Sequence, residues 1–89
     1  MILTTSQSIE GRPVSEYLDI VSYGTFATLP KIKDMGKGEW RAGVDDVNKA
    51  LAGQASSLGA DAVIAIRYEY APHSVGYMVF AAGTAVKLG

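Results

Sequence analysis

The chain has 89 residues and no cysteine, its formal net charge is −1, and 48% of its residues are hydrophobic. This length corresponds to one domain, residues 1–89, and because disulfides and thiolate metal sites are excluded, oligomerisation is the remaining way to supplement a small core. The charge excludes nucleic acid as a partner, because acidic residues lie among the clustered lysines 31–37 and leave no basic stripe.

No targeting or membrane-spanning segment is expected. The amino-terminal residues Met1 to Thr5 are too short and too polar for a signal peptide. The longest apolar run, around Met78 to Ala82, is far shorter than the ~20 residues that span a bilayer. We therefore expect a soluble cytoplasmic protein without a membrane partner.

The amino-terminal third predicts two strands. Ile2 to Thr5 is a short β-prone segment, and residues 9–13 form a turn because glycine supplies positive φ and proline fixes φ. Val14 to Thr28 is the first long strand candidate, in which Gly24 marks a bend or bulge. Its alternation is mixed. Leu18, Ile20 and Phe26 share one parity, and Tyr17, Val21 and Tyr23 share the other.

A loop over Leu29 to Gly38 precedes the single predicted helix, Glu39 to Leu58. Apolar residues recur along the helix at intervals of three and four, which predicts one stripe facing a core. The stripe comprises Trp40, Val44, Val47, Leu51, Ala55 and Leu58. Gly59 fits the left-handed position just beyond the last turn.

Two more strands are predicted, Ala60 to Tyr70 and Gly76 to Leu88, joined by a five-residue connection. Strict alternation in the first of them places Ile64, Ile66, Tyr68 and Tyr70 on one face, and Val63, Ala65, Arg67 and Glu69 on the other. The last strand carries almost no charge. Val79, Ala81, Gly83 and Ala85 occupy the alternate positions at which a solvated face would be polar.

The predicted order is β-β-α-β-β, an α/β (α+β) fold with two layers in which one helix covers an antiparallel sheet. The apolar face of the last strand requires a second covering surface, and in so small a chain another copy of the protein is the simplest one. The alternative is that the strand packs under the chain's own loop.

Several segments resemble the recurring motifs of the YbjQ-like family, also called the putative heavy-metal-binding domain family. They are Thr4-Thr5, Ile9-Glu10-Gly11-Arg12, Glu16-Tyr17-Leu18, Ile20-Val21-Ser22, Leu58-Gly59-Ala60-Asp61-Ala62-Val63 and Gly83-Thr84-Ala85-Val86. The resemblance covers nearly the whole chain. It implies a dodecin-like subunit with a three-stranded antiparallel sheet and one helix, and a ring-shaped homo-oligomer, usually a pentamer. It also implies short extra strands at the subunit contacts, a role that suits Ile2 to Thr5. The family has no established biochemical activity.

Three departures from the family pattern stand out. Asp19 occupies a position where glycine is usual, and Tyr23-Gly24 replaces the usual Gly-Glu. The connection from Phe26 to Trp40 is shorter than is usual in the family.

Metal binding is weakly supported by the residues. Soft metals prefer thiolate, thioether or imidazole ligands, and this chain offers one histidine, His73, three methionines and no cysteine. Asp45 and Asp46 are adjacent on a helix and point about 100° apart, so they do not share a site. A ring would repeat His73 around its axis, which is the remaining route to a metal site.

Other chemistry has little support. No serine, including Ser56 and Ser57, lies in a nucleophile-elbow context, and Gly36-Lys37-Gly38 lacks the full phosphate-loop spacing. The aromatic residues Trp40, Tyr17, Tyr23, Tyr68, Tyr70 and Tyr77 suit sheet packing and subunit contacts, or pockets. Arg67 and Glu69 are expected to form a surface or inter-subunit ion pair.

We assign no catalytic, cofactor-binding or metal-binding residue and no cofactor. The expected function is that of a non-enzymatic domain that assembles with itself, as the pentamer that the resemblance implies, and whose ligand is unknown. One alternative is a heavy-metal-binding protein that uses ring symmetry. The other is a small-molecule carrier with pockets between subunits, by analogy with dodecins.

Overall fold

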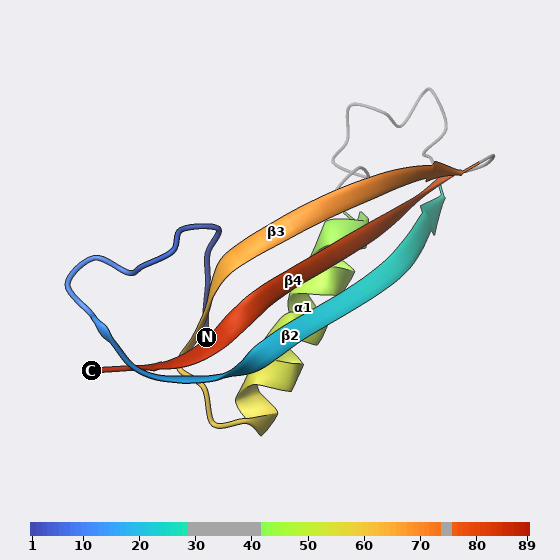
Figure 1. Cartoon of the computed structure of the whole chain (residues 1–89). Helices are drawn as coiled ribbons and strands as arrows, with labels where there is room; N and C mark the ends of the chain where they lie inside the picture. Colours follow the sequence, from blue (N-terminus) through green and yellow to red (C-terminus); the bar gives the residue numbers. More distant parts are fainter. Residues whose placement is uncertain (29–41, 74–75) are drawn as a thin grey trace.

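The protein is described by a computed structural model, which covers residues 1–28, 42–73 and 76–89. The elements follow the predicted β-β-α-β-β order. They are β1 (Ile2–Leu3), β2 (Val14–Thr28), α1 (Ala42–Ser57), β3 (Ala62–His73) and β4 (Gly76–Leu88). The strands form one sheet in the order β1-β3-β4-β2, and α1 lies across one face of it (Figure 1). This is a two-layer α+β fold.

The sheet is mixed rather than purely antiparallel. β3 and β4 pair in an antiparallel ladder, as expected for the two last strands, and a second antiparallel ladder joins β2 to β4. The short strand β1 adds a fourth strand, because Ile2 and Leu3 pair in parallel with Ala62 and Val63 of the same chain. The three strands that the resemblance implied are therefore present, and β1 forms an additional edge.

The helix α1 confirms most of the predicted apolar stripe. Val47, Leu51 and Ala55 are fully buried against the sheet, because residues three and four apart share one face of a helix. The inclusion of Leu58 was wrong: the helix ends at Ser57, and Leu58 is 41% exposed. Trp40 and the loop predicted over Leu29 to Gly38 lie outside the described residues.

The predicted glycine cap of the helix is confirmed. Gly59 has a φ of 78°, and its N–H donates to the carbonyl of Ser56 at 3.0 Å. The N–H of Ala60 donates to the carbonyl of Ala55, also at 3.0 Å. These two hydrogen bonds form a Schellman motif, which satisfies the last helical carbonyls and turns the chain into β3.

A bulge in β3 reverses the predicted faces of its first half. Ala65 has a φ of 54°, and the pairing with β4 shifts between Ile64 and Arg67. The extra residue moves Ile66 to the helix side, in the same cluster as Val63, and leaves Ile64 on the other side with Arg67. Strict alternation was therefore the wrong assumption for this strand.

The face of β4 that we expected to need an outside cover was also misassigned. The predicted set was Val79, Ala81, Gly83 and Ala85. These residues are buried beneath the chain's own helix. The opposite face of β4 carries the alternate residues Met78, Phe80, Ala82, Thr84 and Val86, and it is this face that α1 leaves uncovered.

The chain itself covers one end of this second face. Ile64, Val86 and Leu88 form a small buried cluster with Ala62, and Ile9 and Val14 pack against it. In Figure 1 the segment that contains Ile9 runs beside the end of the sheet where both termini lie. The alternative of a strand packed under its own loop thus holds for this end of the sheet only.

The β3–β4 hairpin is longer than predicted. Ala71, Pro72 and His73 belong to β3, and His73 pairs with Gly76 of β4. The five-residue connection was therefore wrong, and only residues 74–75, outside the described part of the chain, separate the two strands.

Candidate functional site

The sheet face opposite α1 carries a row of exposed apolar side chains, which we call the open face. It comprises Tyr17, Ile20, Phe26, Met78, Phe80 and Ala82, together with Arg67 and Glu69. Ile20 is 72% exposed, Tyr17 70%, Phe80 44% and Phe26 42%. Single exposed apolar residues are ordinary on a protein surface, but a continuous apolar surface indicates an interaction site.

The strand register makes the open face continuous. Phe26 pairs with Met78, and two residues along the ladder Gly24 pairs with Phe80. The next pair on the same face joins Ser22 to Ala82. Neighbouring pairs on one face of an antiparallel ladder touch each other. Met78, Phe80 and Ala82 therefore follow one another on β4, whereas Gly24 and Ser22 separate Phe26 from Ile20 on β2.

Alternation alone could not place Tyr17 and Ile20 on one face. Their sequence separation is odd, so they were assigned to opposite parities. The structure has a register shift between Tyr17 and Asp19, and a second one between Val14 and Glu16. One extra residue in a strand exchanges the faces of all residues beyond it, and no turn residue marks these bulges in the sequence.

A shallow hollow lies within the open face. It has a volume of about 250 Å³ and is lined by Arg67, Glu69, Phe80, Ala81 and Ala82. Pockets for small molecules commonly measure about 300–1,000 Å³ and enclose most of the ligand. This hollow is smaller, and it lies on an open surface, so its shape suits a protruding side chain better than an enclosed small molecule.

The ring of Phe80 lies over Gly24. A Cβ atom placed on Gly24 would come within 2.5 Å of the Phe80 Cδ1 atom. A side chain at position 24 would therefore displace the aromatic ring where it crosses from β4 onto β2, and the packing of the ring over Gly24 compensates for the weak strand propensity of glycine. The departure from the family pattern at Gly24 thus has a structural role in the open face.

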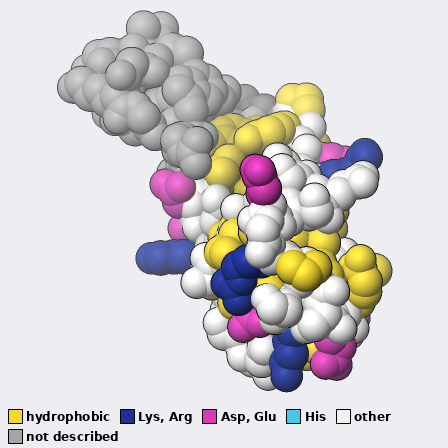
Figure 2. All heavy atoms as spheres, turned by 90° about the vertical axis from the view of Figure 1, so that its left-hand side faces the viewer, with side chains coloured by type: hydrophobic (Ala, Val, Ile, Leu, Met, Phe, Trp, Pro, Cys, Tyr) yellow, Lys and Arg dark blue, Asp and Glu magenta, His cyan; other side chains and the backbone are white. Residues whose placement is uncertain are grey.

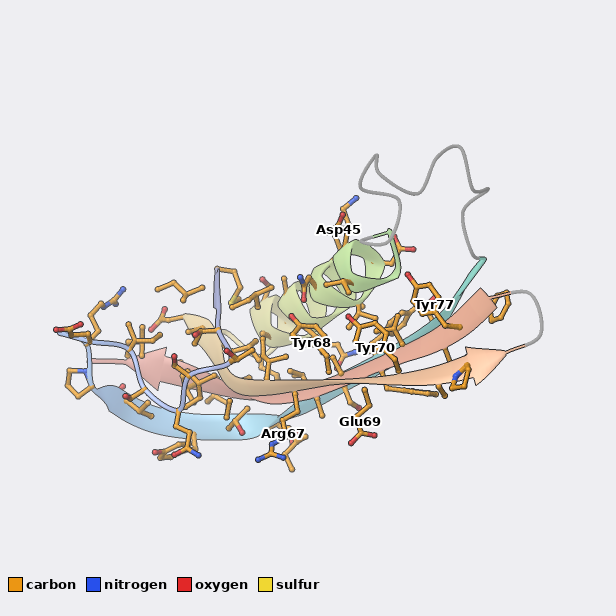
Figure 3. All side chains as sticks on the ribbon, turned by 90° about the horizontal axis from the view of Figure 1, so that it is seen from above. Asp45, Arg67, Tyr68, Glu69, Tyr70 and Tyr77 are labelled. Atoms are coloured by element: carbon orange, nitrogen blue, oxygen red, sulfur yellow. The ribbon has the colours of Figure 1, made fainter. Side chains whose placement is uncertain are left out.

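Arg67 and Glu69 project from β3 on the side opposite the tyrosines of the same strand (Figure 3). Both residues are exposed, and the structure contains no ion pair between them within the described chain. The inter-subunit form of the predicted ion pair stays a prediction.

Tyr68, Tyr70 and Tyr77 lie on the side of the sheet that faces the helix (Figure 3). Tyr68 donates a hydrogen bond from its hydroxyl to the side-chain oxygen of Asn48 on α1. The rings of Tyr70 and Tyr77 are 5.9 Å apart and tilted by 48° (Figure 3). Tyr77 is buried, whereas Tyr70 is 59% exposed. Tyr17 and Tyr23 are exposed on β2.

The residues considered as metal ligands lie on two different elements. His73 is the last residue of β3 rather than a loop residue, whereas Asp45 and Asp46 are exposed at the start of α1. Within residues 1–28, 42–73 and 76–89, no group of three or more His, Cys, Asp or Glu side chains is placed to hold a metal ion. Gly36-Lys37-Gly38 lies outside the described residues.

Charges of both signs are interspersed on the end of the molecule where the termini lie (Figure 2).

The Ser57 hydroxyl donates a hydrogen bond to the carbonyl of Gly53 at 3.1 Å, as expected of an ordinary helical serine. In the described part of the chain, no helix is long and apolar enough to cross a membrane.

Comparison with known proteins decides the family. Residues 39–89 match the model of a family described as "Putative heavy-metal-binding" (YbjQ_1). A UPF0145 protein of Pseudomonas putida strain W619 is 31% identical, and the match covers 99% of each chain. The chain belongs to this family. A UPF0145 protein of Pseudomonas fluorescens strain Pf0-1 is 38% identical, again over 99% of each chain.

The relatives are longer within the matched region. The alignment with the Pseudomonas putida protein spans 105 positions, whereas this chain has 89 residues, so the relative contains additional residues. The fold is shared with a solved protein of unknown function from Pediococcus pentosaceus, described as a member of the DUF74 family. The two chains superpose with a TM-score of 0.72 at 17% identity, covering 100% of this chain and 98% of the other.

The motifs that carried the family resemblance have structural roles. Gly59 caps α1, as described above. Asp61 accepts a hydrogen bond from the Leu88 N–H at 2.9 Å, and its own N–H donates to the Val86 carbonyl at 2.8 Å. Gly83 lies beneath the side chains of Val63 and Ile66. Gly59, Asp61 and Gly83 of these motifs therefore contribute to the fold of the chain.

Proposed function

We propose that this protein is a non-enzymatic domain that associates with copies of itself through the open face. The observation that carries the proposal is the exposed apolar row on β2 and β4, in which Ile20 and Tyr17 are about 70% exposed. Burial of apolar surface stabilises by roughly 25 cal/mol per Å² removed from water. Covering this row with another copy would gain the stabilisation that the single subunit leaves unused.

The dimensions of the subunit support the same proposal. The chain measures 46 × 21 × 18 Å, and its radius of gyration is 14.7 Å. A compact domain of this length would have a radius of gyration of about 12 Å. The long, narrow subunit has a large surface for its volume, so association with neighbours would compensate for a thin core.

We further propose that the assembly is a closed ring, with five copies as the expected number. The open face combines protruding side chains on β2 with the hollow beside Arg67 and Glu69. A contact between two different parts of one surface is heterologous, and heterologous contacts form closed rings when the rotation permits. One positive and one negative side chain at the hollow also suit a contact without net charge.

Native mass spectrometry combined with light scattering tests this proposal. The wild-type chain should give one discrete homo-oligomer, and Ile20→Glu should give mainly monomer, because a carboxylate would have to be buried at the contact. Ile20 is 72% exposed in the single chain, so this substitution should leave folding intact.

Lys49→Gln is the matched control. It lowers the net charge by one unit, as Ile20→Glu does, but it lies at an exposed position on α1, in the opposite layer. A monomeric wild-type protein, or an Ile20→Glu variant that assembles as the wild type does, would contradict the proposal.

Metal binding is a second candidate, favoured by the description of the matched family. A site formed by ring symmetry would use His73 from several copies, since each chain has a single histidine. Metal analysis of untagged protein and of His73→Ala tests this candidate. Bound zinc or copper that is lost in His73→Ala would support it, and protein that carries neither metal after incubation would rule it out.

A further inference from the structure

The outer edge of β2 is the second feature of the molecule that bears on association. In the strand order β1-β3-β4-β2, β2 pairs with β4 on one side and has no neighbouring strand on the other within the described residues. With 15 residues it is a long strand. A free strand edge presents unpaired N–H and C=O groups and can pair with a strand of another molecule.

Gln54 of α1 occupies this edge at Ser22. The Ser22 N–H donates to Gln54 Oε1 at 3.1 Å, and Gln54 Nε2 donates to the Ser22 carbonyl at 2.7 Å. A side-chain amide has one acceptor and one donor side, so it reproduces the pair of hydrogen bonds that a neighbouring strand would make. Ser22 is therefore already satisfied by the chain's own helix.

Asp19 occupies the edge at Ile20. The Ile20 N–H donates to Asp19 Oδ1 at 2.7 Å, a charge-assisted hydrogen bond. Ile20 and Ser22 are two residues apart, so their backbone groups point to the same side of the strand, away from β4. Glycine is usual at the position of Asp19 in the family pattern, and glycine could not make this contact.

The beginning of β2 is protected in another way. Register shifts between Val14 and Glu16 and between Tyr17 and Asp19 distort this part of the strand. Bulges twist an edge away from regular pairing and are a common protection of exposed strands. The bulges and the two side-chain contacts therefore follow one another from Val14 to Ser22.

We propose that Gln54 and Asp19 form an edge guard that prevents β2 from pairing with an extended strand of a second copy of this chain. Association is thereby directed to other surfaces of the subunit. The inference rests on hydrogen bonds at the strand edge and does not require the open face to be an interface. A bidentate amide contact at the middle of the strand leaves no uninterrupted row of free backbone groups for a partner.

Three variants test the edge guard: Gln54→Ala, Asp19→Ala and the double variant. Native mass spectrometry over a concentration series should show species larger than the wild-type assembly in the double variant, and fewer of them in each single variant. Amide hydrogen exchange at Ser22 reports the edge directly. At low protein concentration its exchange should be at least tenfold faster in Gln54→Ala, and it should slow as the larger species form.

Lys49→Ala, on the same helix, is the control and should match the wild type in both measurements. Gln54→Glu provides a second route if Gln54→Ala fails to fold. Its carboxylate accepts the Ser22 N–H but has no proton for the Ser22 carbonyl, so it should give an intermediate amount of the larger species. Faster exchange at Ser22 without larger species would overturn the proposal, as would unchanged exchange.

The same variants separate this inference from the proposed function. Ile20→Glu removes the open-face contact and retains the Ile20 N–H and both guard residues. If the guard is correct and the open-face proposal is wrong, Ile20→Glu will assemble as the wild type does while the double guard variant forms larger species. If only the open-face proposal is correct, the double guard variant will keep the wild-type assembly.

Discussion

Ala65 of β3 and Gly83 of β4 lie opposite each other, and the bulge at Ala65 is compatible with the core because Gly83 has no side chain. The bulge at Ala65 sets Ala65 and Ile66 against the single residue Gly83. Val63 and Ile66 consequently project on the same side, and their Cγ1 atoms would be 2.6 and 2.9 Å from a Cβ placed on Gly83. The missing side chain of Gly83 makes room for the two apolar side chains that the bulge brings together.

Gly83→Ala should destabilise the fold by about 1–3 kcal/mol, because an added methyl group would overpack this point of the core. The backbone carbonyl oxygen of Ile64 would lie 3.1 Å from that methyl group, which limits how far the site can relax. Urea unfolding at a fixed protein concentration measures the change.

Gly53→Ala is the matched control for that experiment. Gly53 is exposed within α1, and nothing lies within 4 Å of a Cβ placed on it. Alanine there should stabilise by about 0.5–1 kcal/mol through its higher helix propensity. Equal effects of the two substitutions would contradict the packing account of Gly83.

Ala65→Gly should stabilise the protein by about 0.5–1 kcal/mol, since a φ of 54° is costly for alanine and free for glycine. Ala65→Val should destabilise it by about 1–2 kcal/mol, because a β-branched residue is a clear outlier at positive φ. Thermal unfolding of the pair measures both. If Ala65→Gly is no more stable than the wild type, residue 65 does not have a positive φ in solution.

The sequence predicted the elements better than it predicted the faces. The Val14–Thr28 and Gly76–Leu88 boundaries were correct because turn residues and β-branched runs are local signals. The faces of β2 and β3 were wrong in part because a bulge is decided by long-range packing, here by the fit of Ile66 over Gly83. The register shift between Tyr17 and Asp19 places Tyr17 and Ile20 on the same exposed face, and simple alternation of side chains could not predict this.

The guard at the edge of β2 illustrates a second limit. Gln54 is one polar residue on the outer part of a helix, and nothing in its local sequence distinguishes it from a solvated position. Its role depends on the placement of α1 next to Ser22, which is 32 residues away in the chain. Contacts of this kind become visible only when the two layers are assembled.

Leu51→Ala should destabilise the subunit by about 2–5 kcal/mol, since Leu51 is fully buried at the centre of the helix stripe. Leu58→Ala should change stability by less than about 1 kcal/mol, because Leu58 lies beyond the helix and is 41% exposed. Far-UV circular dichroism during urea titration compares the two. Similar losses would indicate that Leu58 is covered in the assembled protein.

Asp61→Ala should destabilise the protein by about 1–3 kcal/mol, because the N–H of Leu88 would lose its acceptor where β3 begins and β4 ends. Asp61→Asn should lose less stability than Asp61→Ala, since the side-chain oxygen of asparagine can still accept that hydrogen bond. The backbone bond from the Asp61 N–H to Val86 is independent of the side chain and should persist in both variants. Amide hydrogen exchange at Leu88 tests the mechanism directly: it should rise in Asp61→Ala and stay near the wild-type value in Asp61→Asn. Equal exchange rates at Leu88 in the two variants would contradict this account of the Asp61 side chain.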